Sequence, residues 1–567
     1  MPDRRDAPGA LPDFSPAARE RHWWVLDRRV WDLLVIGGGI TGTGIARDAA
    51  GRGLSTALVE AGDWAEGTSS RSSRLVHGGL RYLETGDFRL VFEALAERRR
   101  LLELAPHLVR PLPFLFPVFR KSSVGVHRLR AGMWLYDALS LFRGVRRHRM
   151  LRRGAVAEVE PRLTREGVLG GAVYYDASVD DARLTLMVAR GAHEAGAATV
   201  PHAEVLGFMQ DEGGMRGARV RDCFTGEVKE VRARVVVNAT GPWCDTLRRL
   251  ADPGVRPRLR PTKGVHVVLR RERVGNAGAI IFRSPLDGRV MFVLPWGDFT
   301  YVGTTDTDYE GPPARASASR ADVDYLLASA NDLFPEAKLV PRDVLSTWTG
   351  VRPLLAPQAT AGAGPSESST SREHEIWRDR SGLVNVGGGK LTTYRVMATQ
   401  TVDFAVRLLR ASGGAGEIGD ALTADLPLPG TPAEPWEAFE ARIRGAARAL
   451  ALPEAAVPHL MHAYGEDADT ILAAVREDRG LGAPIVPGLP YLWAEVPHVV
   501  AKEMGMTLED VLRRRLHVFY ETADGGVGVA REVAERMAAV PGIGWDEAEI
   551  DRQVEAYRQA VEETRGS

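Results

Sequence analysis

Three glycines and one acidic residue near the start of the chain have the spacing of a dinucleotide-binding turn. Gly37–Gly42 reads GGGITG and fits G-x-G-x-x-G, between the apolar run Trp31–Ile36 and a helical stretch from Ile40 to about residue 52. Glycines here permit a tight turn and close backbone approach to a pyrophosphate, which the helix N-terminus attracts. Glu60 ends the next apolar run, where a carboxylate can accept a hydrogen bond from a ribose hydroxyl. The pattern predicts FAD or NAD; the alternative is a glycine-rich turn in an unrelated α/β protein.

Two later turns of small residues also follow apolar runs. Asn238–Trp243 (NATGPW) follows Arg234–Val237, and Gly387–Lys390 (GGGK) follows Leu383–Val386. Three such strand ends suit one long cofactor folded into a single crevice, so they favour FAD over NAD. Serines in the stretch 67–82 can add hydroxyl groups around the cofactor; the alternative is a flexible polar loop.

The first of these turns is positioned by a strand, a helix and a second strand, namely Trp31–Ile36, the helical stretch from Ile40 and Ser55–Glu60. This order predicts a parallel sheet. Other expected helices cover Ser15–Leu26, Arg183–Gly196, 322–331 and the stretch up to Leu409, and other strands cover Val235–Val237 and parts of 255–305. Thr507–Asp510 resembles a capping box that opens a helix.

The composition divides the chain into four parts. We expect a leader over 1–30, a core over 31–410, a Gly/Pro-rich linker over 411–435 and a helical domain over 436–562. Within the core, the cofactor-binding segments are about 31–105, 183–250 and 345–410, and the substrate-domain segments are about 106–182 and 251–344.

The overall composition excludes several classes of protein. The 567 residues are 44% hydrophobic and carry a formal net charge of −1, which excludes wholesale disorder and gives no reason to expect nucleic-acid binding. Two cysteines, Cys223 and Cys244, fit a reducing compartment, and no residue set has metal-ligand spacing. Without a signal peptide or a long apolar run, we expect a cytoplasmic protein, with peripheral contact on the cytoplasmic face of a membrane left open.

One segment is both basic and apolar. Residues 119–153 contain ten Lys or Arg and one acid, Asp137, and the apolar residues Leu129, Met133, Trp134, Tyr136 and Leu139 lie among the cations. Such a segment can lie in the headgroup layer of an anionic membrane. The alternative is a solvent-facing helix whose apolar side packs on the core.

Five segments together resemble FAD-dependent glycerol-3-phosphate dehydrogenases, within the D-amino-acid-oxidase-like flavoproteins. They are TSSRSSRLVHGGLRYLE, NATGPW, PWGDFTYVGTTD, TGVRPL and GGGKLTTYRVMA, and the resemblance covers about residues 31–410, with a similar helical tail. It implies an α/β fold in which a Rossmann-like FAD-binding domain is interleaved with a mixed or antiparallel β-sheet substrate domain, followed by a C-terminal α-helical domain.

The resemblance also implies a reaction and partners. It implies that sn-glycerol 3-phosphate is oxidised to dihydroxyacetone phosphate by hydride transfer from C2 to flavin N5, with electrons passing to a quinone. A homodimer is expected. The alternatives are an oxidase that passes electrons to oxygen and releases hydrogen peroxide, an amino-acid or amine oxidase, and a flavin-binding scaffold without turnover.

Site residues follow from the matching positions. The predicted catalytic residues are His77, Arg352 and Lys390, and the predicted substrate-binding residues are Arg81, Tyr82, His266, Thr304, Arg352, Arg372 and Lys390. Arg81, Tyr82 and Arg372 are assigned mainly to the phosphate, because a guanidinium suits phosphate oxygens. Arg352 and Lys390 are expected near the reacting carbon and the flavin N1/O2 edge, where cations stabilise negative charge.

His77 is the candidate general base, because an imidazole titrates near neutral pH; otherwise it lines the flavin or bonds the backbone. Lys263 is a secondary candidate with His266. The predicted FAD contacts are Gly37, Gly39, Ile40, Thr41, Gly42, Glu60, Ser69, Ser70, Ser72, Arg74, Leu75, His77, Gly79, Val205, Ala239, Thr240, Gly241, Trp243, Gly388, Gly389, Lys390, Leu391 and Thr392.

Overall fold

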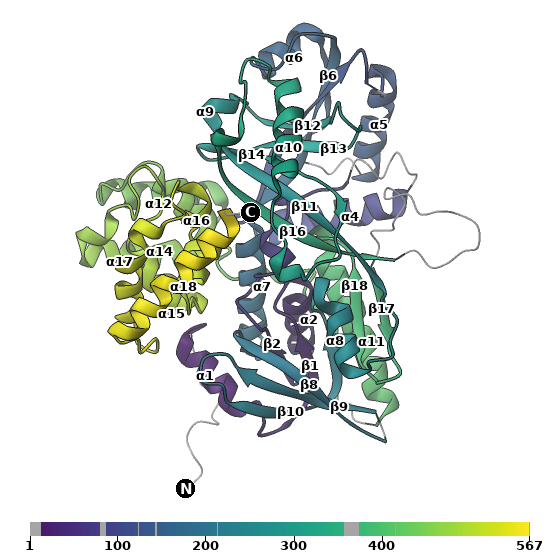
Figure 1. The fold of residues 1–567 in the computed structure, drawn as a ribbon, viewed down its shortest axis with the longest axis vertical. Coiled ribbons are helices and arrows are strands. Elements are labelled where there is room, and N and C mark those ends of the chain that lie inside the picture. Colours follow the sequence, from purple (N-terminus) through teal and green to yellow (C-terminus); the bar gives the residue numbers. More distant parts are fainter. Residues whose placement is uncertain are drawn as a thin grey trace, which may run out of the picture.

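The computed structural model describes residues 13–79, 87–122, 124–141, 145–212, 214–356, 374–413 and 416–565. Two β-sheets form an elongated core, and a cluster of helices from the C-terminal part packs against one side of it (Figure 1). The expected α/β fold with a helical C-terminal region is therefore confirmed.

The first sheet contains the predicted βαβ unit. Among the described residues it has eight strands, in the order β17-β18-β10-β1-β2-β7, with β9 paired to β10 and β8 to β9. The bounds are β1 (Val30–Ile36), β2 (Thr56–Val59), β7 (Ala198–Val200), β8 (Ala203–Asp211), β9 (Gly214–Asp222), β10 (Val228–Asn238), β17 (His374–Arg378) and β18 (Val384–Gly388). β1 pairs in parallel with both β2 and β10. The carboxyl ends of these strands therefore meet at one edge, where ligands of such sheets bind.

Helices bury the central strands of this sheet. α2 (Ile40–Gly51), α7 (Asp181–Glu194) and α11 (Tyr394–Ala411) pack together and share one apolar core with β1. The other first-sheet helices are α1 (Pro16–Val25) and α8 (Cys244–Ala251). The apolar run of β1 is almost wholly buried, as expected of a strand covered on both faces.

The second sheet is mixed and mostly antiparallel. Its ten described strands run β15-β11-β14-β13-β12-β4-β6-β3, with β16 paired to β11 and β5 to β6. The bounds are β3 (Leu75–Val76), β4 (Val109–Phe119), β5 (Arg149–Arg152), β6 (Val168–Val179), β11 (Leu259–Arg270), β12 (Ala279–Arg283), β13 (Val290–Trp296), β14 (Phe299–Gly303), β15 (Thr307–Asp308) and β16 (Val344–Leu355). The helices around it are α4 (Phe88–Leu104), α5 (Val126–Leu139), α6 (Arg153–Val159), α9 (Arg271–Val274) and α10 (Arg320–Leu333).

One strand differs from the expected division of the chain. The sequence assigned residues from about 345 onward to the cofactor-binding segments, but β16 pairs with β11 of the second sheet along nearly its whole length. The reason is a long antiparallel register, from Leu259 opposite Leu355 to Leu269 opposite Val344, which no local pattern reveals. β16 also contacts β18, so it joins the two sheets.

The C-terminal helices are α12 (Trp436–Ala449), α13 (Ala456–Tyr464), α14 (Ala468–Glu477), α15 (Glu495–Glu503), α16 (Val518–Glu521), α17 (Val527–Ala538) and α18 (Glu547–Arg565). A π-helical stretch, Asp510–Arg515, precedes α16. The predicted capping box is confirmed, since the Thr507 hydroxyl accepts from the Asp510 amide and the Asp510 carboxylate accepts from the Thr507 amide.

The described residues of the leader and of the linker pack on the core. α1 confirms the short helix expected near the N-terminus, and its Arg19 side chain is buried against Asp222 and the carbonyl oxygen of His202. In the linker, the Thr423 hydroxyl donates to the Asp48 carboxylate of α2 at 3.1 Å. The described parts of both segments, 13–30 of the leader and most of the linker, therefore belong to the packed structure.

Candidate active site

The glycine turn lies at the carboxyl end of β1 and packs directly on the turn after β10. Gly37 has φ of +114°, and a Cβ there would lie 2.7 Å from the carbonyl oxygen of Ala239. A Cβ on Gly42 would lie 1.9 Å from the carbonyl oxygen of Gly37. Only glycine fits these two positions, and the result is a backbone cradle at the start of α2. The geometry fits a pyrophosphate, which binds amide groups at a helix N-terminus.

Glu60 borders this cradle, as the sequence predicted. Its carboxylate accepts hydrogen bonds from the amides of Gly38 at 2.5 Å and Gly62 at 2.9 Å. Burial raises the pKa of Glu60, although these two amides oppose the shift. Because a carboxylate has about four acceptor sites, lone pairs remain for a ribose hydroxyl.

The predicted serine-rich stretch lies over the cradle. The Ser69 hydroxyl accepts from the amide of Ile40, the first residue of α2, at 2.9 Å. The Thr68 hydroxyl donates to the carbonyl oxygen of Val351 in β16 at 2.6 Å. Ser72 is held elsewhere, because its hydroxyl donates to Asp181 at 2.6 Å. The loop thus connects the cradle to β16 and to α7.

Arg352 extends from β16 at the junction of the two sheets. It forms hydrogen bonds to Asp306 at 3.0 Å, to the Thr304 hydroxyl at 3.1 Å and to the Thr305 carbonyl oxygen at 3.2 Å. Its guanidinium lies over the backbone of Gly264, where any Cβ would come within 2.4 Å of it. Because Gly264 has no side chain, the Arg352 guanidinium can occupy this position. The predicted residue Thr304 lies beside Arg352.

His266 is buried beside this arginine. Its Nε2 lies 2.9 Å from the Ser73 hydroxyl, and its ring stacks on Trp348 with centroids 4.9 Å apart. Burial, followed by the charges of Arg352 and Arg74, holds the pKa of His266 well below its usual value. His266 is therefore neutral near pH 7 and can act as a hydrogen-bonding group.

His77 and Lys390 belong to two segments that touch. The His77 amide donates to the Thr392 hydroxyl at 3.2 Å, and Lys390 precedes the short helical turn Leu391–Thr393 that contains Thr392. Gly388 and Gly389 come before Lys390 with φ of +76° and +84°, a conformation that favours glycine. The chain needs these glycines to turn from β18 toward His77.

One short segment connects the two groups of residues. Ser73 bonds His266, and four residues later His77 bonds the turn of Lys390. Four residues of extended chain span at most about 14 Å. The Arg352 group and the Lys390 group therefore border one region between the sheets.

Other predicted residues have different outcomes. Arg81, Tyr82 and Arg372 lie outside the described residues. Lys263 does not turn toward this region, because its ammonium group bonds Asp322 of α10 at 2.7 Å. Arg74 is buried, with its guanidinium carbon 4.0 Å from the centroid of the Trp296 ring. Its predicted contact with the cofactor stays a prediction, as do those of the remaining FAD-site residues.

Comparisons with known proteins identify the family. Residues 32–395 match the family model described as FAD dependent oxidoreductase, and residues 421–550 match the C-terminal domain of alpha-glycerophosphate oxidase. Glycerol-3-phosphate dehydrogenase 2 of Mycobacterium tuberculosis is 41% identical, over 97% of this chain and 91% of that protein. The chain belongs to the FAD-dependent glycerol-3-phosphate dehydrogenase family.

Two more relatives span nearly the whole chain of this family member. Alpha-glycerophosphate oxidase of Enterococcus casseliflavus is 33% identical, over 97% of this chain and 98% of that protein. The crystal structure of the glycerol-3-phosphate dehydrogenase from Bacillus halodurans, complexed with FAD, is 32% identical with a TM-score of 0.78, and the match covers 97% of this chain and 98% of that one. The predicted FAD-dependent oxidoreductase is confirmed, and the cradle fits that cofactor.

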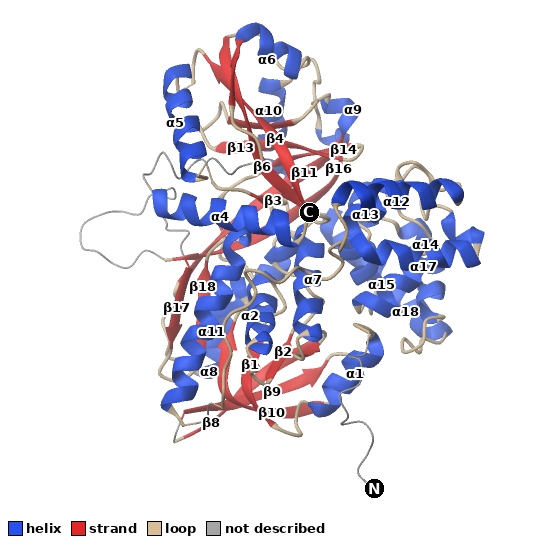
Figure 2. Cartoon of the chain, turned by 180° about the vertical axis from the view of Figure 1, so that it is seen from behind, coloured by secondary structure: helices blue, strands red, loops and turns tan. Residues whose placement is uncertain are grey.

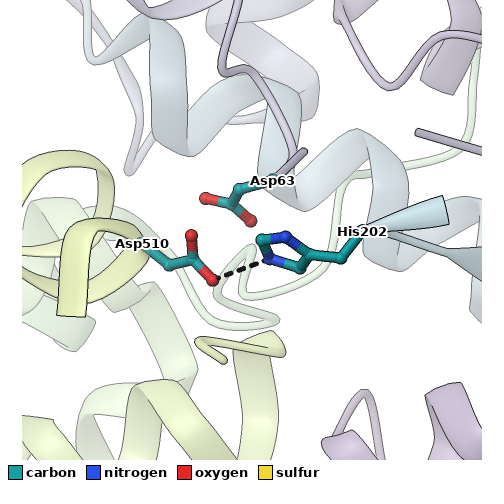
Figure 3. Close-up of side chains that lie close together, drawn as sticks. All are labelled: Asp63, His202 and Asp510. Carbon is teal, nitrogen blue, oxygen red and sulfur yellow. Dashed lines mark hydrogen bonds and ion pairs between the residues drawn. The ribbon is translucent and has the colours of Figure 1, made fainter. Parts of the chain in front are cut away.

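Several charged residues near the cradle were not predicted from the sequence of this family member. Asp180 lies between β6 and α7 and Asp181 is the first residue of α7, and the Asp180 side chain accepts from the Arg183 amide at 3.1 Å. Acidic residues just before a helical stretch are an N-cap signal that could have indicated Asp180. Asp63, His202 and Asp510 form another unpredicted cluster (Figure 3). No local signal marks that cluster, because its members come from three distant parts of the chain.

Proposed function

We propose that this protein oxidises sn-glycerol 3-phosphate to dihydroxyacetone phosphate. FAD, when bound, supplies the acceptor for the hydride that leaves C2 of the substrate. The chain must then hold a phosphate dianion, orient the carbon and remove the hydroxyl proton. The relatives' names support this substrate, and the cationic groups at the junction of the two sheets suit an anionic one.

The placement of Arg352 is the observation that carries the proposal. Its guanidinium is oriented by Asp306 and Thr304 on a strand that joins the cofactor-binding sheet to the second sheet. A fixed cation at this junction can stabilise negative charge that develops during the reaction, without reorganising when it forms. Lys390 would add a second positive charge from the opposite segment, and Arg81, Tyr82 and Arg372 would hold the phosphate.

His77 is the proposed base. Its backbone is bonded to Thr392, so its position is tied to the Lys390 turn. His266 is less suited, because its depressed pKa and its contact with Ser73 favour a fixed, neutral role. An unchanged pH–rate profile in His77→Ala would remove His77 as the base.

The decisive experiment is an absorbance spectrum of the purified protein before and after anaerobic addition of glycerol 3-phosphate. We expect loss of the visible flavin absorbance with this substrate and no loss with a panel of amino acids and amines. Arg352→Ala should retain FAD but lose the bleaching, whereas Arg320→Ala, at a 74% exposed side chain, should bleach as the wild type does. A spectrum that stays unchanged on adding glycerol 3-phosphate would refute the proposal.

For the electron acceptor we propose a quinone, with oxygen as the alternative. The 33% identical relative named an oxidase keeps the alternative open. Exposing the substrate-reduced protein to air separates the two. Slow reoxidation in air and fast reoxidation by a soluble quinone would support the quinone, and fast reoxidation by oxygen alone would support the oxidase. The predicted homodimer stays a prediction.

We also propose that the basic segment 119–153 contacts an anionic membrane. Leu129, Met133 and Tyr136 of α5 pack on the core, as the structural alternative predicted, but Trp134 and Leu135 are 52% and 38% exposed. The exposed residues Phe88 and Phe92 lie on α4, which contacts α5 (Figure 2). Exposed arginines around these side chains could bind lipid phosphates while the apolar groups enter the headgroup layer.

The membrane proposal does not involve a spanning segment. Within the described ranges, every helix is too short or too polar to cross a bilayer. Co-sedimentation with anionic vesicles, but not with neutral ones, is the expected result. Equal recovery in the supernatant with both kinds of vesicle would refute the contact.

A further inference from the structure

One segment of the C-terminal domain contacts both turns that border the cofactor cradle. We call residues 509–521 the C-terminal clamp; they include the π-helical stretch Asp510–Arg515 and α16. The two turns are the acid turn, Glu60–Glu66, and the serine loop, 67–75. The clamp reaches each turn through buried charged side chains.

Two arginines of the clamp bind the acid turn through Asp63. Arg514 Nε donates to Asp63 at 2.5 Å, and Arg515 Nη2 donates to its other carboxylate oxygen at 2.9 Å. These side chains are at most 4% exposed. Asp63 lies three residues after Glu60, and its neighbour Trp64 packs against Gly38, where a Cβ would lie 2.7 Å from the indole ring. The clamp therefore fixes the turn that places Glu60 beside the cradle.

His202 and Asp510 strengthen the same contact. Figure 3 shows Asp63, His202 and Asp510 pointing toward one another, and their ligand atoms lie within 4.8 Å of each other. Such spacing could suit a metal ion. Asp510, however, already accepts from Arg514 at 2.7 Å, from the amides of residues 506 and 507 at 3.0 Å, and pairs with His202 Nε2 at 3.1 Å.

The charges around this cluster decide between a metal site and an ion-pair network. Both oxygens of Asp63 and both oxygens of Asp510 have arginine, histidine or amide partners. The guanidinium groups of Arg514 and Arg515 would repel a divalent cation at this point. The cluster is a network of ion pairs that joins the clamp to the acid turn.

The clamp reaches the serine loop through two adjacent aspartates. His517 Nε2 lies 2.5 Å from Asp180, and the next residue, Asp181, accepts from the hydroxyl and the amide of Ser72 at 2.6 and 2.9 Å. Burial alone would raise the pKa of Asp180, but the charge and hydrogen bond of His517 outweigh it and lower that pKa. The carboxylate therefore stays ionised at the contact.

Tyr520 makes a second contact with the serine loop. The guanidinium carbon of Arg74 lies 4.0 Å from the ring centroid of Trp296, 5.0 Å from that of Trp348 and 5.9 Å from that of Tyr520. Burial would raise the pKa of the Tyr520 hydroxyl, but Arg513 and Arg71 lower it. Cations of the loop and the clamp thus surround one aromatic ring at the domain interface.

We propose that the C-terminal clamp positions the acid turn and the serine loop for FAD, with Asp63 and His517 as positioning residues. A cofactor that binds turns already held in place does not have to order them, so holding them raises its affinity. The C-terminal domain thereby sets FAD affinity through contacts with these turns. The proposal rests on FAD binding and is independent of the substrate.

The test compares Asp63→Asn and His517→Gln with Asp467→Asn as a matched control. Asp467 also forms an ion pair between the C-terminal domain and α7, with Arg190. Arg190 lies nine residues along α7 from Asp181, or about 14 Å of helix, away from Ser72. FAD affinity is measured by titrating the apoprotein with FAD, following flavin fluorescence, and the cofactor environment by visible circular dichroism of the holoprotein.

We expect the Kd for FAD to rise at least tenfold, with altered visible circular dichroism, in both Asp63→Asn and His517→Gln. Asp467→Asn should lower the melting temperature yet keep the Kd within twofold and the spectrum unchanged.

An unchanged Kd in a test variant would overturn the proposal for the turn that it contacts. An equal rise in the control would overturn it altogether, because the effect would then follow stability. If Asp63→Asn does not fold, His517→Gln decides alone. A failure to oxidise glycerol 3-phosphate would not alter any of these results.

Discussion

The interface between the C-terminal domain and the core buries charges, whereas the surface of α4 and α5 exposes apolar side chains. At the interface, the side chains of Arg515 and Glu503 are at most 1% exposed. On the other surface, Trp134 and Phe88 are 52% and 47% exposed. The C-terminal helices and α5 lie on opposite sides of the core (Figures 1 and 2).

The difference follows from what each region contacts. A buried charge is tolerated only with a partner, and Arg183, Arg514 and Arg515 each have a carboxylate within hydrogen-bonding distance. An exposed apolar side chain needs no such partner, but several of them together mark a surface suited to a membrane or to another protein. Side-chain type alone would assign both regions to the wrong environment.

The largest expected effect comes from removing one buried charge. Glu503→Gln leaves Arg183 of α7 buried without its full negative partner, which lies 3.1 Å from Nη1. Breaking a buried pair costs about 3–5 kcal/mol. The urea-denaturation midpoint should therefore fall clearly. A midpoint within error of the wild type would show that the interface tolerates an unpaired charge.

The next effect is on pH dependence, because three histidines that lie wholly or partly inside the protein, His22, His107 and His462, have lowered pKa values. Burial lowers the pKa of His22 to about 4 and those of His107 and His462 to about 3. At a pH between these lowered values and 6.5, the histidines of the unfolded chain bind more protons than those of the folded protein. The free energy of unfolding is therefore highest above pH 6.5 and falls as the pH drops. At pH 5 each of these histidines should lower the free energy of unfolding by about 2 kcal/mol relative to pH 7.

Denaturation midpoints at pH 7 and pH 5 check this expectation. His462 stacks on Trp436 with ring centroids 5.2 Å apart, so His462→Phe keeps the ring and removes one titrating group. The variant should lose less stability than the wild type on acidification. Equal losses in the two proteins would contradict the assignment.

A smaller effect is expected at the exposed apolar surface. Trp134→Glu should weaken binding to anionic vesicles about tenfold while changing stability by less than about 0.5 kcal/mol. Leu422→Glu is the matched control, because Leu422 is 51% exposed but lies in the linker. Vesicle co-sedimentation and thermal melting measure the two quantities. Equal losses of binding in both variants would point to nonspecific charge repulsion.

The smallest effect is expected for an exposed ion pair. Glu555 and Arg558 of α18 lie 2.9 Å apart, but their side chains are 53% and 49% exposed. Glu555→Gln should cost less than about 1 kcal/mol, because water screens such pairs. A loss as large as that of Glu503→Gln would remove the distinction between buried and exposed charges.

Much of the cofactor cradle could be predicted from the sequence, because its determinants are local. A strand, three glycines and Glu60 lie within thirty residues of each other, and the structure places them together. The surroundings of Arg352 could not be predicted equally well. Its strand pairs with β11, more than eighty residues earlier, and Lys263 of β11 turns instead to Asp322.

The sequence by itself determined the βαβ unit, the glycine turn, the FAD-dependent family and the helical C-terminal part. Tertiary structure alone decided that Arg514 and Arg515, in a run of three arginines with the composition of a solvated surface, are buried against the acid turn. Asp63 lies 451 residues from Arg514, and Asp180 lies 337 residues from His517. Local patterns report which face of an element is apolar, but the partner of a buried charge depends on how distant elements pack.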